Sequence, residues 1–438
     1  MSFGSELKAQ GSLPTQHNLR TLADLHPANE GTTPMQLTFP YQTDRLGAIR
    51  IYGVQHVFEL DSDPAEPESY FGTTVSHVPT PAMLAVQRRM AVVIPCRNER
   101  LRILEGVLTG IPHATQLIFV SNSDREPVDR FMMECDTIER FCRYSRRSAV
   151  IVHQRDPGLG KAFAAGGFPH LLDEDGLVRS GKGEGMIVGI VLALLAGKEY
   201  IGFVDSDNFV PGSVNEYVRV YASDFHLART RFAMVRICWK SKPKVVDGAL
   251  FFSRWGRTSE TTNRLLNLLL AGYTGFGTDS IATGNAGEHA LTMELALRLR
   301  LAGGFAIEPF QFIDLFERFG GVTETRAPQE HPDLMKEGVQ VFQVETANPH
   351  FHEDRGADHV EDMVAASLGS LYHSPAANDQ VRRAIEELVG AAPALPEPPY
   401  PPLSSLDVTA FWPVLLEHAP TFSQVVFPEG SETLPIGG

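Results

Sequence analysis

The chain has 438 residues, of which 43% are apolar and 21% charged, and its formal net charge is −15. The length allows two or three domains with a sizeable core, and the composition excludes a wholly disordered, collagen-like or coiled-coil protein. The acidic balance argues against a general binder of nucleic acid or anionic membranes, so we expect neither partner, but it leaves room for a small anion in a locally basic pocket.

The N-terminal part and the cysteines favour a cytoplasmic protein. Residues 1–35 are polar with scattered Gly, Pro and Thr, which predicts a loose tail without the apolar core of a signal peptide. The longest apolar stretch, near Met186–Leu195, reaches about half the ~20 residues that a membrane span needs. The four cysteines form no C-x-x-C pair, so we expect neither a zinc ribbon nor a disulfide framework.

From residue 91 onward, short apolar runs alternate with helix-like stretches. The apolar runs are rich in β-branched residues and predict buried strands at 91–95, 116–120, 149–153 and 201–204. The stretches between them predict helices at 100–109, 127–141 and 184–196. This alternation predicts an α/β protein with a mainly parallel, doubly wound, Rossmann-like sheet that has helices on both faces.

Every predicted strand ends in a polar cluster. In a doubly wound sheet the ligand lies beyond the carboxyl ends of the strands. We therefore expect one site built from the clusters at 96–99, 121–124, 154–156 and 205–207.

The last of these clusters is the sequence Asp205-Ser206-Asp207. Two carboxylates separated by one residue after a strand can face one divalent cation, and such oxygen ligands suit Mg²⁺ or Mn²⁺. The same pattern also occurs in helix caps and Asx turns. Its position after the fourth strand favours the metal.

Two Gly/Lys loops, at 158–161 and 181–185, can approach phosphate closely. The stretch 176–182 nearly matches a P-loop. It differs because Gly183 stands where a P-loop needs Ser or Thr, and because it does not follow the first strand. The alternative for each loop is a surface turn.

A glycine-containing loop at 283–289 precedes a Leu/Ala-rich stretch at 290–302. That stretch alternates in places, as a strand does, but its Ala, Met, Glu and Arg content favours a helix. The loop would then lie at a helix N-terminus, where anions bind. The alternative is a simple N-cap loop.

The C-terminal third contains a histidine pair and a proline-rich stretch. His350 and His352 would share one face of an extended segment, where either can ligate a metal. A helix is predicted at 358–372. The stretch 393–402 reads as a linker or surface wrap, and the apolar residues near 411–415 predict that the segment after it docks on the body.

Taken together, these motifs resemble a known family. The chain resembles the GT-A nucleotide-sugar glycosyltransferases and, more narrowly, is similar to the mannosyl-3-phosphoglycerate synthases of glycosyltransferase family 55. The matching pieces span about residues 38–372 and read VVIPCRNE (92–99), FVSNSDRE (119–126), HQRDPGLGKAF (153–163), GKGEGM (181–186), YIGFVDSDNFVPG (200–212), TGNAGEHA (283–290) and NPHFHE (348–353).

The resemblance implies a GT-A fold and a metal-dependent, retaining transferase. Mannose would move from GDP-mannose to the 2-hydroxyl of 3-phosphoglycerate, on the route to the compatible solute mannosylglycerate. We expect a nucleotide-sugar half at 36–215 and an acceptor-binding half at 216–390. The tail at 1–35 and a proline-rich linker with a C-terminal segment at 391–438 lie outside the resemblance.

The resemblance also implies roles for single residues. Donor-binding residues would be Pro95, Arg97, Asn98, Glu99, Ser121, Asp124, Gln154, Lys161, Lys182, Gly183, Glu184 and Asp205. Acceptor-binding residues would be Thr283, Gly284, Asn285, Ala286, Gly287 and His289.

The catalytic and metal-binding groups follow from the same resemblance. Asp207 and Glu288 would be catalytic, with Glu288 orienting the acceptor hydroxyl or the sugar. Asp205 and Asp207 would bind the metal together with His350 or His352, between which the sequence does not decide. Mg²⁺ is the expected ion, with Mn²⁺, Co²⁺ and Zn²⁺ as alternatives. A homodimer is left open.

Three alternatives compete with this interpretation. A sugar-nucleotide pyrophosphorylase needs a glycine-rich loop directly after its first strand, and residues 95–99 contain no glycine. A non-catalytic nucleotide-binding protein would not need both Asp205 and Asp207. A related synthase could use a different sugar, or glycerate in place of phosphoglycerate, since residue chemistry alone indicates only an anionic acceptor.

Overall fold

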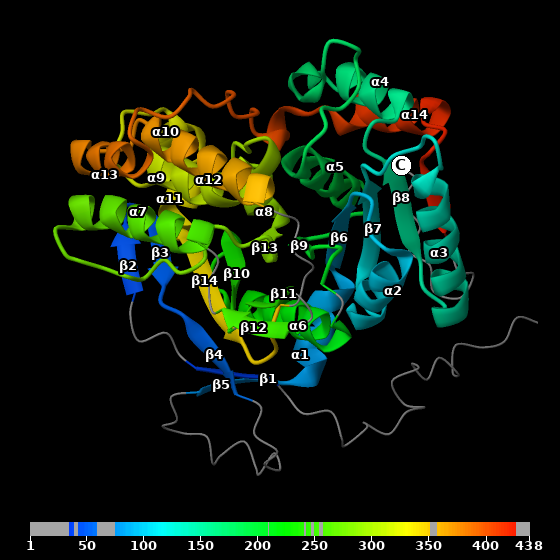
Figure 1. The fold of residues 1–438 in the computed structure, drawn as a ribbon, viewed down its shortest axis with the longest axis horizontal. Coiled ribbons are helices and arrows are strands. Elements are labelled where there is room, and N and C mark those ends of the chain that lie inside the picture. The colour runs from blue at the N-terminus through cyan, green and yellow to red at the C-terminus, as the bar shows by residue number, and fades with distance from the viewer. Residues whose placement is uncertain are drawn as a thin grey trace, which may run out of the picture.

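One long mixed sheet runs through the molecule and carries helices on both faces (Figure 1). The computed structural model describes residues 35–38, 43–58, 75–208, 210–240, 242–246, 249–253, 257–350 and 357–425. The predicted N-terminal tail therefore lies outside the described residues, except for Met35. The strand order is β15-β8-β7-β6-β9-β13-β10-β14-β4-β1-β5, and β2 and β3 join at β14.

The nucleotide-sugar half predicted from the sequence contains a parallel core of four strands. Its strands pair in the order β8-β7-β6-β9 and are β6 (Met90–Cys96), β7 (Gln116–Ser121), β8 (Ala149–His153) and β9 (Tyr200–Phe203). The helices between them are α2 (Leu101–Gly110), α3 (Arg130–Ser145), α4 (Pro157–Ala165) and α5 (Lys182–Leu195). All four predicted strands and all three predicted helices are confirmed to within a few residues, and so is the α/β fold class with a parallel core.

The continuous apolar runs are explained by burial on both faces of this core. In β6, Ala91 and Val93 pack in one hydrophobic cluster with α5, whereas Val92 and Ile94 pack in a second cluster with α2. Successive side chains of a strand point to opposite faces, so a strand covered on both sides has no polar position.

The predicted helix at 290–302 is wrong. Residues His289–Thr292 form strand β13, and only the short α8 (Met293–Ala296) follows it. β13 lies between β9 and β10 (Ala233–Trp239) and is antiparallel to both. Hydrogen bonds to two neighbouring strands outweigh the helix propensity of this segment. The loop at 283–289 consequently leads into a strand and not into a helix N-terminus.

The second half of the sheet is built around β14 (Val339–Thr346), which is parallel to β10, β3 and β4. The other strands are β1 (Met35–Thr38), β2 (Thr43–Leu46), β3 (Ile49–Tyr52), β4 (Gln55–Phe58), β5 (Val75–Val78), β11 (Lys242–Val246), β12 (Ala249–Ser253) and β15 (Ser423–Val425). The other helices are α1 (Thr80–Arg88), α6 (Pro211–Leu227), α7 (Arg257–Thr274), α9 (Ile307–Phe319), α10 (Ala327–Glu330), α11 (Pro332–Glu337), α12 (Ala357–Tyr372), α13 (Asp379–Val389) and α14 (Val408–His418). The helix predicted at 358–372 is confirmed as α12.

The C-terminal segment docks on the body, as its apolar residues predict. Phe411 and Leu415 of α14 are fully buried, and α14 packs against α4 at the top right of Figure 1. β15 then adds an antiparallel edge strand to β8. None of the described helices has the length and hydropathy needed to cross a membrane.

Close packing of α5 on β6 depends on one glycine. A Cβ at Gly189 would lie 2.4 Å from Cγ1 of Val93, and a β-branched side chain in a strand cannot easily turn away. We expect Gly189→Ala to lower the free energy of unfolding by about 1–3 kcal/mol, since overpacking outweighs the gain in helix propensity of about 1 kcal/mol. Urea denaturation measures this. Gly277→Ala, where a Cβ meets nothing within 4 Å, is the control, and equal effects of the two changes would contradict the argument.

Candidate active site

A buried carboxylate holds the ends of β6 and β7 together. Glu134 of α3 accepts hydrogen bonds from Ser121 Oγ and Ser123 Oγ, both at 2.6 Å, and from Cys96 Sγ at 3.5 Å. Burial raises the pKa of the Cys96 thiol well above its usual value, so the thiol stays protonated. Ser121, predicted to bind the donor, thus contacts the protein interior instead of facing the open edge.

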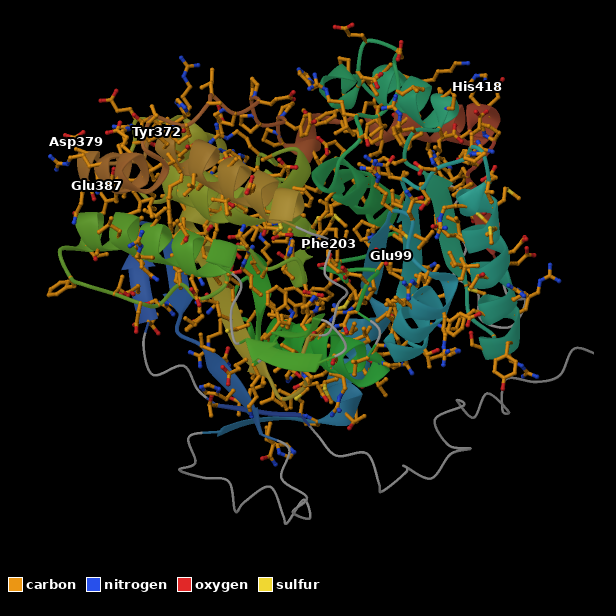
Figure 2. The ribbon with its side chains drawn as sticks, in the orientation of Figure 1. Glu99, Phe203, Tyr372, Asp379, Glu387 and His418 are labelled. Carbon is orange, nitrogen blue, oxygen red and sulfur yellow. The ribbon has the colours of Figure 1, made fainter. Side chains whose placement is uncertain are left out.

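Hydrogen bonds connect the loop after β6 to the loop after β7. Asn98 adopts a left-handed backbone conformation with φ 58°, which Asn tolerates better than most residues. The Asn98 side-chain Nδ2 donates to Asp124 Oδ2 at 2.9 Å, and the Asn98 side-chain Oδ1 accepts from the Asp124 backbone N–H at 3.0 Å. The exposed Arg97 and Asn98 and the half-buried Pro95 and Glu99 therefore lie together at the carboxyl edge; Figure 2 labels Glu99 there, and Phe203 at the end of β9.

The two Gly/Lys loops have different positions. Gln154, which follows β8, donates to the carbonyls of Arg179 at 2.6 Å and Gly181 at 3.0 Å. These two hydrogen bonds fix the start of the 181–185 loop beside the end of β8. Lys161 lies exposed on α4. Gly183 packs on the 302–304 backbone, where a Cβ would be 2.7 Å from the Ala302 carbonyl oxygen.

Lys182, the first residue of α5, links the end of β9 to helix α9. Its Nζ lies 2.7 Å from Asp205 Oδ1 and 2.8 Å from Glu308 Oε1 of α9. Burial alone would lower the pKa of this ammonium, but the two carboxylates raise it well above its usual value. Lys182 is therefore a permanent cation at the carboxyl edge of the parallel strands.

Asp207 lies beside the ion pairs that Lys182 makes with the other two carboxylates. Burial and the neighbouring Asp205 and Glu288 carboxylates raise the pKa of Asp207 to about 6, while His350 and Lys182 oppose the shift. The His350 imidazole lies 3.2 Å from Glu288 Oε1, and both side chains are buried. Three carboxylates, one imidazole and one ammonium thus share this corner, which we call the acidic corner: Lys182, Asp205, Asp207, Glu288 and His350.

The donor set of the acidic corner fits a divalent cation. Neutralising Asp205 and Asp207 would remove the repulsion that raises the pKa of Asp207. Among the residues that the structure describes, no three His, Cys, Asp or Glu side chains form a ready metal site. A divalent cation held here would therefore need ligands from a substrate or from water besides these side chains. His352, the other predicted ligand, lies outside the described residues.

The predicted acceptor loop reaches the same corner. A Cβ at Gly287 would lie 2.5 Å from Asp205 Oδ2 and 2.7 Å from Lys182 Nζ, so a larger residue here would displace the two charged groups. The rest of the loop is buried and held by protein groups: Arg236 Nε donates to the Thr283 carbonyl at 2.9 Å, Asn263 Oδ1 accepts from Gly284 N at 2.7 Å, and Asn285 Nδ2 donates to Ser367 Oγ at 3.0 Å.

Both ring nitrogens of His289 are hydrogen-bonded to other groups of the protein. Its Nδ1 donates to the Ala286 carbonyl at 2.9 Å, which leaves Nε2 to accept from the Gln311 amide at 2.7 Å. Burial and the nearby Arg236 push its pKa well below the usual value, so the ring is neutral. His289 therefore supports the turn of the loop.

Sequence reasoning missed two carboxylates of this region. Glu308 pairs with Lys182 and is buried within α9, and Glu134 holds the ends of β6 and β7. α9 carries three acidic residues among its apolar ones, Glu308, Asp314 and Glu317, and no local signal singles out Glu308. Its partner is 126 positions away in the chain, so no spacing rule could have paired them.

The structure therefore defines an α/β protein with a candidate ligand site at the carboxyl ends of its parallel strands, where the Lys182 ammonium and several carboxylates lie beside the 283–289 loop. A family model described as mannosyl-3-phosphoglycerate synthase (osmo_MPGsynth) matches residues 39–415. Mannosyl-3-phosphoglycerate synthase of Pyrococcus furiosus is 42% identical over 394 residues, which cover 88% of this chain and 98% of that protein. The enzyme of Aeropyrum pernix is 36% identical over 368 residues, or 84% and 92% of the two chains.

The chain belongs to the mannosyl-3-phosphoglycerate synthase family, which confirms the resemblance seen in its motifs. Among solved structures it is similar to glucosyl-3-phosphoglycerate synthase of Mycobacterium tuberculosis, in complex with Mn²⁺, UDP-glucose and phosphoglyceric acid. That likeness has a TM-score of 0.45 and 18% identity, and covers 73% of this chain and 93% of the other.

The Lys182–Glu308 pair yields a stability test. Glu308 is 2% exposed, so Lys182→Met leaves a buried carboxylate without its cation and should lower the free energy of unfolding by about 3 kcal/mol. The double variant Lys182→Met/Glu308→Gln should recover most of the loss. Urea denaturation of the set measures the coupling.

The control is the exposed pair Arg89–Glu199, with side chains 46% and 57% exposed. Arg89→Met should cost less than about 1 kcal/mol. A Lys182→Met cost no larger than that of Arg89→Met would contradict the buried pairing.

Proposed function

We propose that the protein transfers mannose from GDP-mannose to the 2-hydroxyl of 3-phosphoglycerate and retains the configuration at the anomeric carbon. The observation that carries this proposal is the acidic corner, which lies at the carboxyl edge of the parallel strands in a chain that belongs to this family. Family membership supports the substrates, and the corner supports the chemistry.

The donor would lie along the carboxyl ends of β6, β7 and β9. Pro95, Arg97, Asn98, Glu99 and Asp124 would line the guanosine end, since they meet at one edge of the sheet. The diphosphate would lie at the N-terminus of α5, where backbone N–H groups, the helix dipole and the Lys182 ammonium all favour negative charge. Ser121, Gln154 and Glu184 would act indirectly, because each already binds another group of the protein.

Asp205 and Asp207, with His350, would hold the divalent metal, for which Mg²⁺ is our first proposal and Mn²⁺ the second. When bound, the metal supplies a Lewis acid that stabilises charge on the departing diphosphate. Lys182 adds a fixed positive charge to the same leaving group.

The reaction would proceed on one face of the sugar. The bond between the mannose C1 and the diphosphate oxygen breaks, C1 becomes oxocarbenium-like, and the 2-hydroxyl of phosphoglycerate forms the new C1–O bond from the side of the leaving group. The hydroxyl proton passes to the departing phosphate oxygen. Glu288, buried beside His350, would orient the acceptor hydroxyl or the sugar, and the 283–289 loop would form the acceptor side.

Removing one metal-binding carboxylate tests this mechanism. We expect Asp207→Asn to lower the kcat of mannosyl transfer by about 10²–10³-fold or more, because leaving-group charge loses its electrostatic stabilisation. GDP release is measured with GDP-mannose, with and without 3-phosphoglycerate, in Mg²⁺, Mn²⁺ or EDTA. Release by the unchanged protein should require both acceptor and metal.

Parallel reactions with GDP-glucose and with glycerate measure donor and acceptor strictness. No release from the unchanged protein with any acceptor, despite tight binding of GDP-mannose, would overturn the enzyme proposal in favour of a nucleotide-binding protein. Pyrophosphate-dependent formation of mannose 1-phosphate and GTP from GDP-mannose would instead favour the pyrophosphorylase.

The choice between the two histidines is tested separately. His350 lies buried at the acidic corner, so we expect His350→Ala to raise the Mg²⁺ concentration for half-maximal activity by about 10-fold or more, in the range of lost metal-site groups. His352→Ala is the matched comparison. A larger effect of His352→Ala would contradict the assignment. The homodimer and the cytoplasmic location remain predictions.

A further inference from the structure

The C-terminal segment from Tyr400 to Val425, which we call the C-terminal strap, contacts both Gly/Lys loops of the proposed donor site. In Figure 1 it ends at the outer edge of the sheet, where α14 lies against α4. We infer that the strap positions the nucleotide-sugar loops through two hydroxyl groups, those of Tyr400 and Thr421. This inference rests on the proposed function.

The first contact is at the N-terminus of α5. Tyr400 Oη donates to Glu184 Oε1 at 2.7 Å, and Glu184 Oε2 accepts from Gly304 N at 3.1 Å. Backbone hydrogen bonds between Tyr400 and Leu301, at 2.8 and 3.4 Å, hold the tyrosine in place. Glu184 lies two residues after Lys182 in the first turn of α5, so its carboxylate fixes the turn that carries the lysine.

The second contact is at the end of β8. Asp156 caps α4 with one carboxylate oxygen, which accepts from Gly158 N at 2.7 Å. Its other oxygen accepts from Thr421 N at 2.8 Å and from the Thr421 hydroxyl. The same hydroxyl accepts from His153 N at 3.1 Å. Thr421 thereby bridges the last residue of β8 to the cap of α4, on both sides of Gln154, which holds the second loop.

Packing between these contacts keeps the strap in place. Phe411 meets Phe163 edge to face with ring centroids 4.9 Å apart. A Cβ at Gly158 would lie 2.0 Å from the His418 carbonyl oxygen, so α14 and the first turn of α4 are in backbone contact. His418 is labelled at the end of α14 in Figure 2.

Tyr400 and Thr421 are positioning residues in this arrangement, because both act through carboxylates behind the loops. Loss of either hydroxyl should loosen loop geometry, which affects capture of the donor more than the chemical step or the acceptor. The expected signature is a raised KM for GDP-mannose with kcat and the KM for 3-phosphoglycerate nearly unchanged.

The experiment compares Thr421→Val, Thr421→Ser and Tyr400→Phe in the full chain. Thr421→Val and Tyr400→Phe should each raise the KM for GDP-mannose, and the Kd for GDP in calorimetry with Mg²⁺ present, by about 3–10-fold, a part of the cost of one charge-assisted hydrogen bond. Thr421→Ser retains the hydroxyl and should restore both values. The control is Thr409→Val, which removes an exposed hydroxyl on the same strap that binds only Asp407 among the described contacts.

Each outcome decides whether the Tyr400 and Thr421 hydroxyls position the donor-binding loops or only stabilise the fold. If Thr421→Val and Tyr400→Phe change only the melting temperature and leave the GDP affinity and the KM for GDP-mannose at the values of Thr409→Val, the inference is overturned. The same holds if Thr421→Ser fails to restore affinity. If the unchanged protein binds GDP but transfers no mannose, the proposed function fails, and the GDP affinities still decide the role of the strap.

Discussion

The Lys182 ammonium between Asp205 and Glu308 is the interaction on which the rest of the site depends. It joins the first turn of α5, the end of β9 and helix α9, which come from distant parts of the chain. The buried Glu308 carboxylate needs this compensation, and the two ion pairs fix three backbones relative to one another. The approach of Gly287 to Asp205 and Lys182 adds the 283–289 loop as a fourth.

The sheet explains why these groups can meet. Parallel strands end at one edge of the sheet, so the polar residues after β6, β7, β8 and β9 lie side by side. Asn98 and Asp124, for example, are in contact although they are 26 positions apart in the chain. β13 then enters antiparallel between β9 and β10. Its insertion brings the 283–289 loop to the end of β9, next to the polar residues that follow the parallel strands.

Much of the fold was predictable because its signals are local. Apolar runs with β-branched residues predicted β6 to β9, and the Asp205/Asp207 pair after β9 predicted part of the acidic corner. The segment at 290–302 was mispredicted because helix propensity is local whereas pairing with β9 and β10 is not. Ser121 and His289 were assigned to substrates by motif, but the structure shows each bound to buried protein groups, Glu134 and Gln311.

The sequence by itself determined the α/β class, the family, and the residues that carry charge at the ends of the strands, since residue type and periodicity are properties of short segments. Only the tertiary structure decided which of those charges meet. Glu308 joins Lys182, Glu134 joins Ser121, and Thr421 joins Asp156 across 265 positions. Such pairings depend on how helices and strands pack, because hydrogen bonds and ion pairs act over a few ångströms in space and not over distance along the chain.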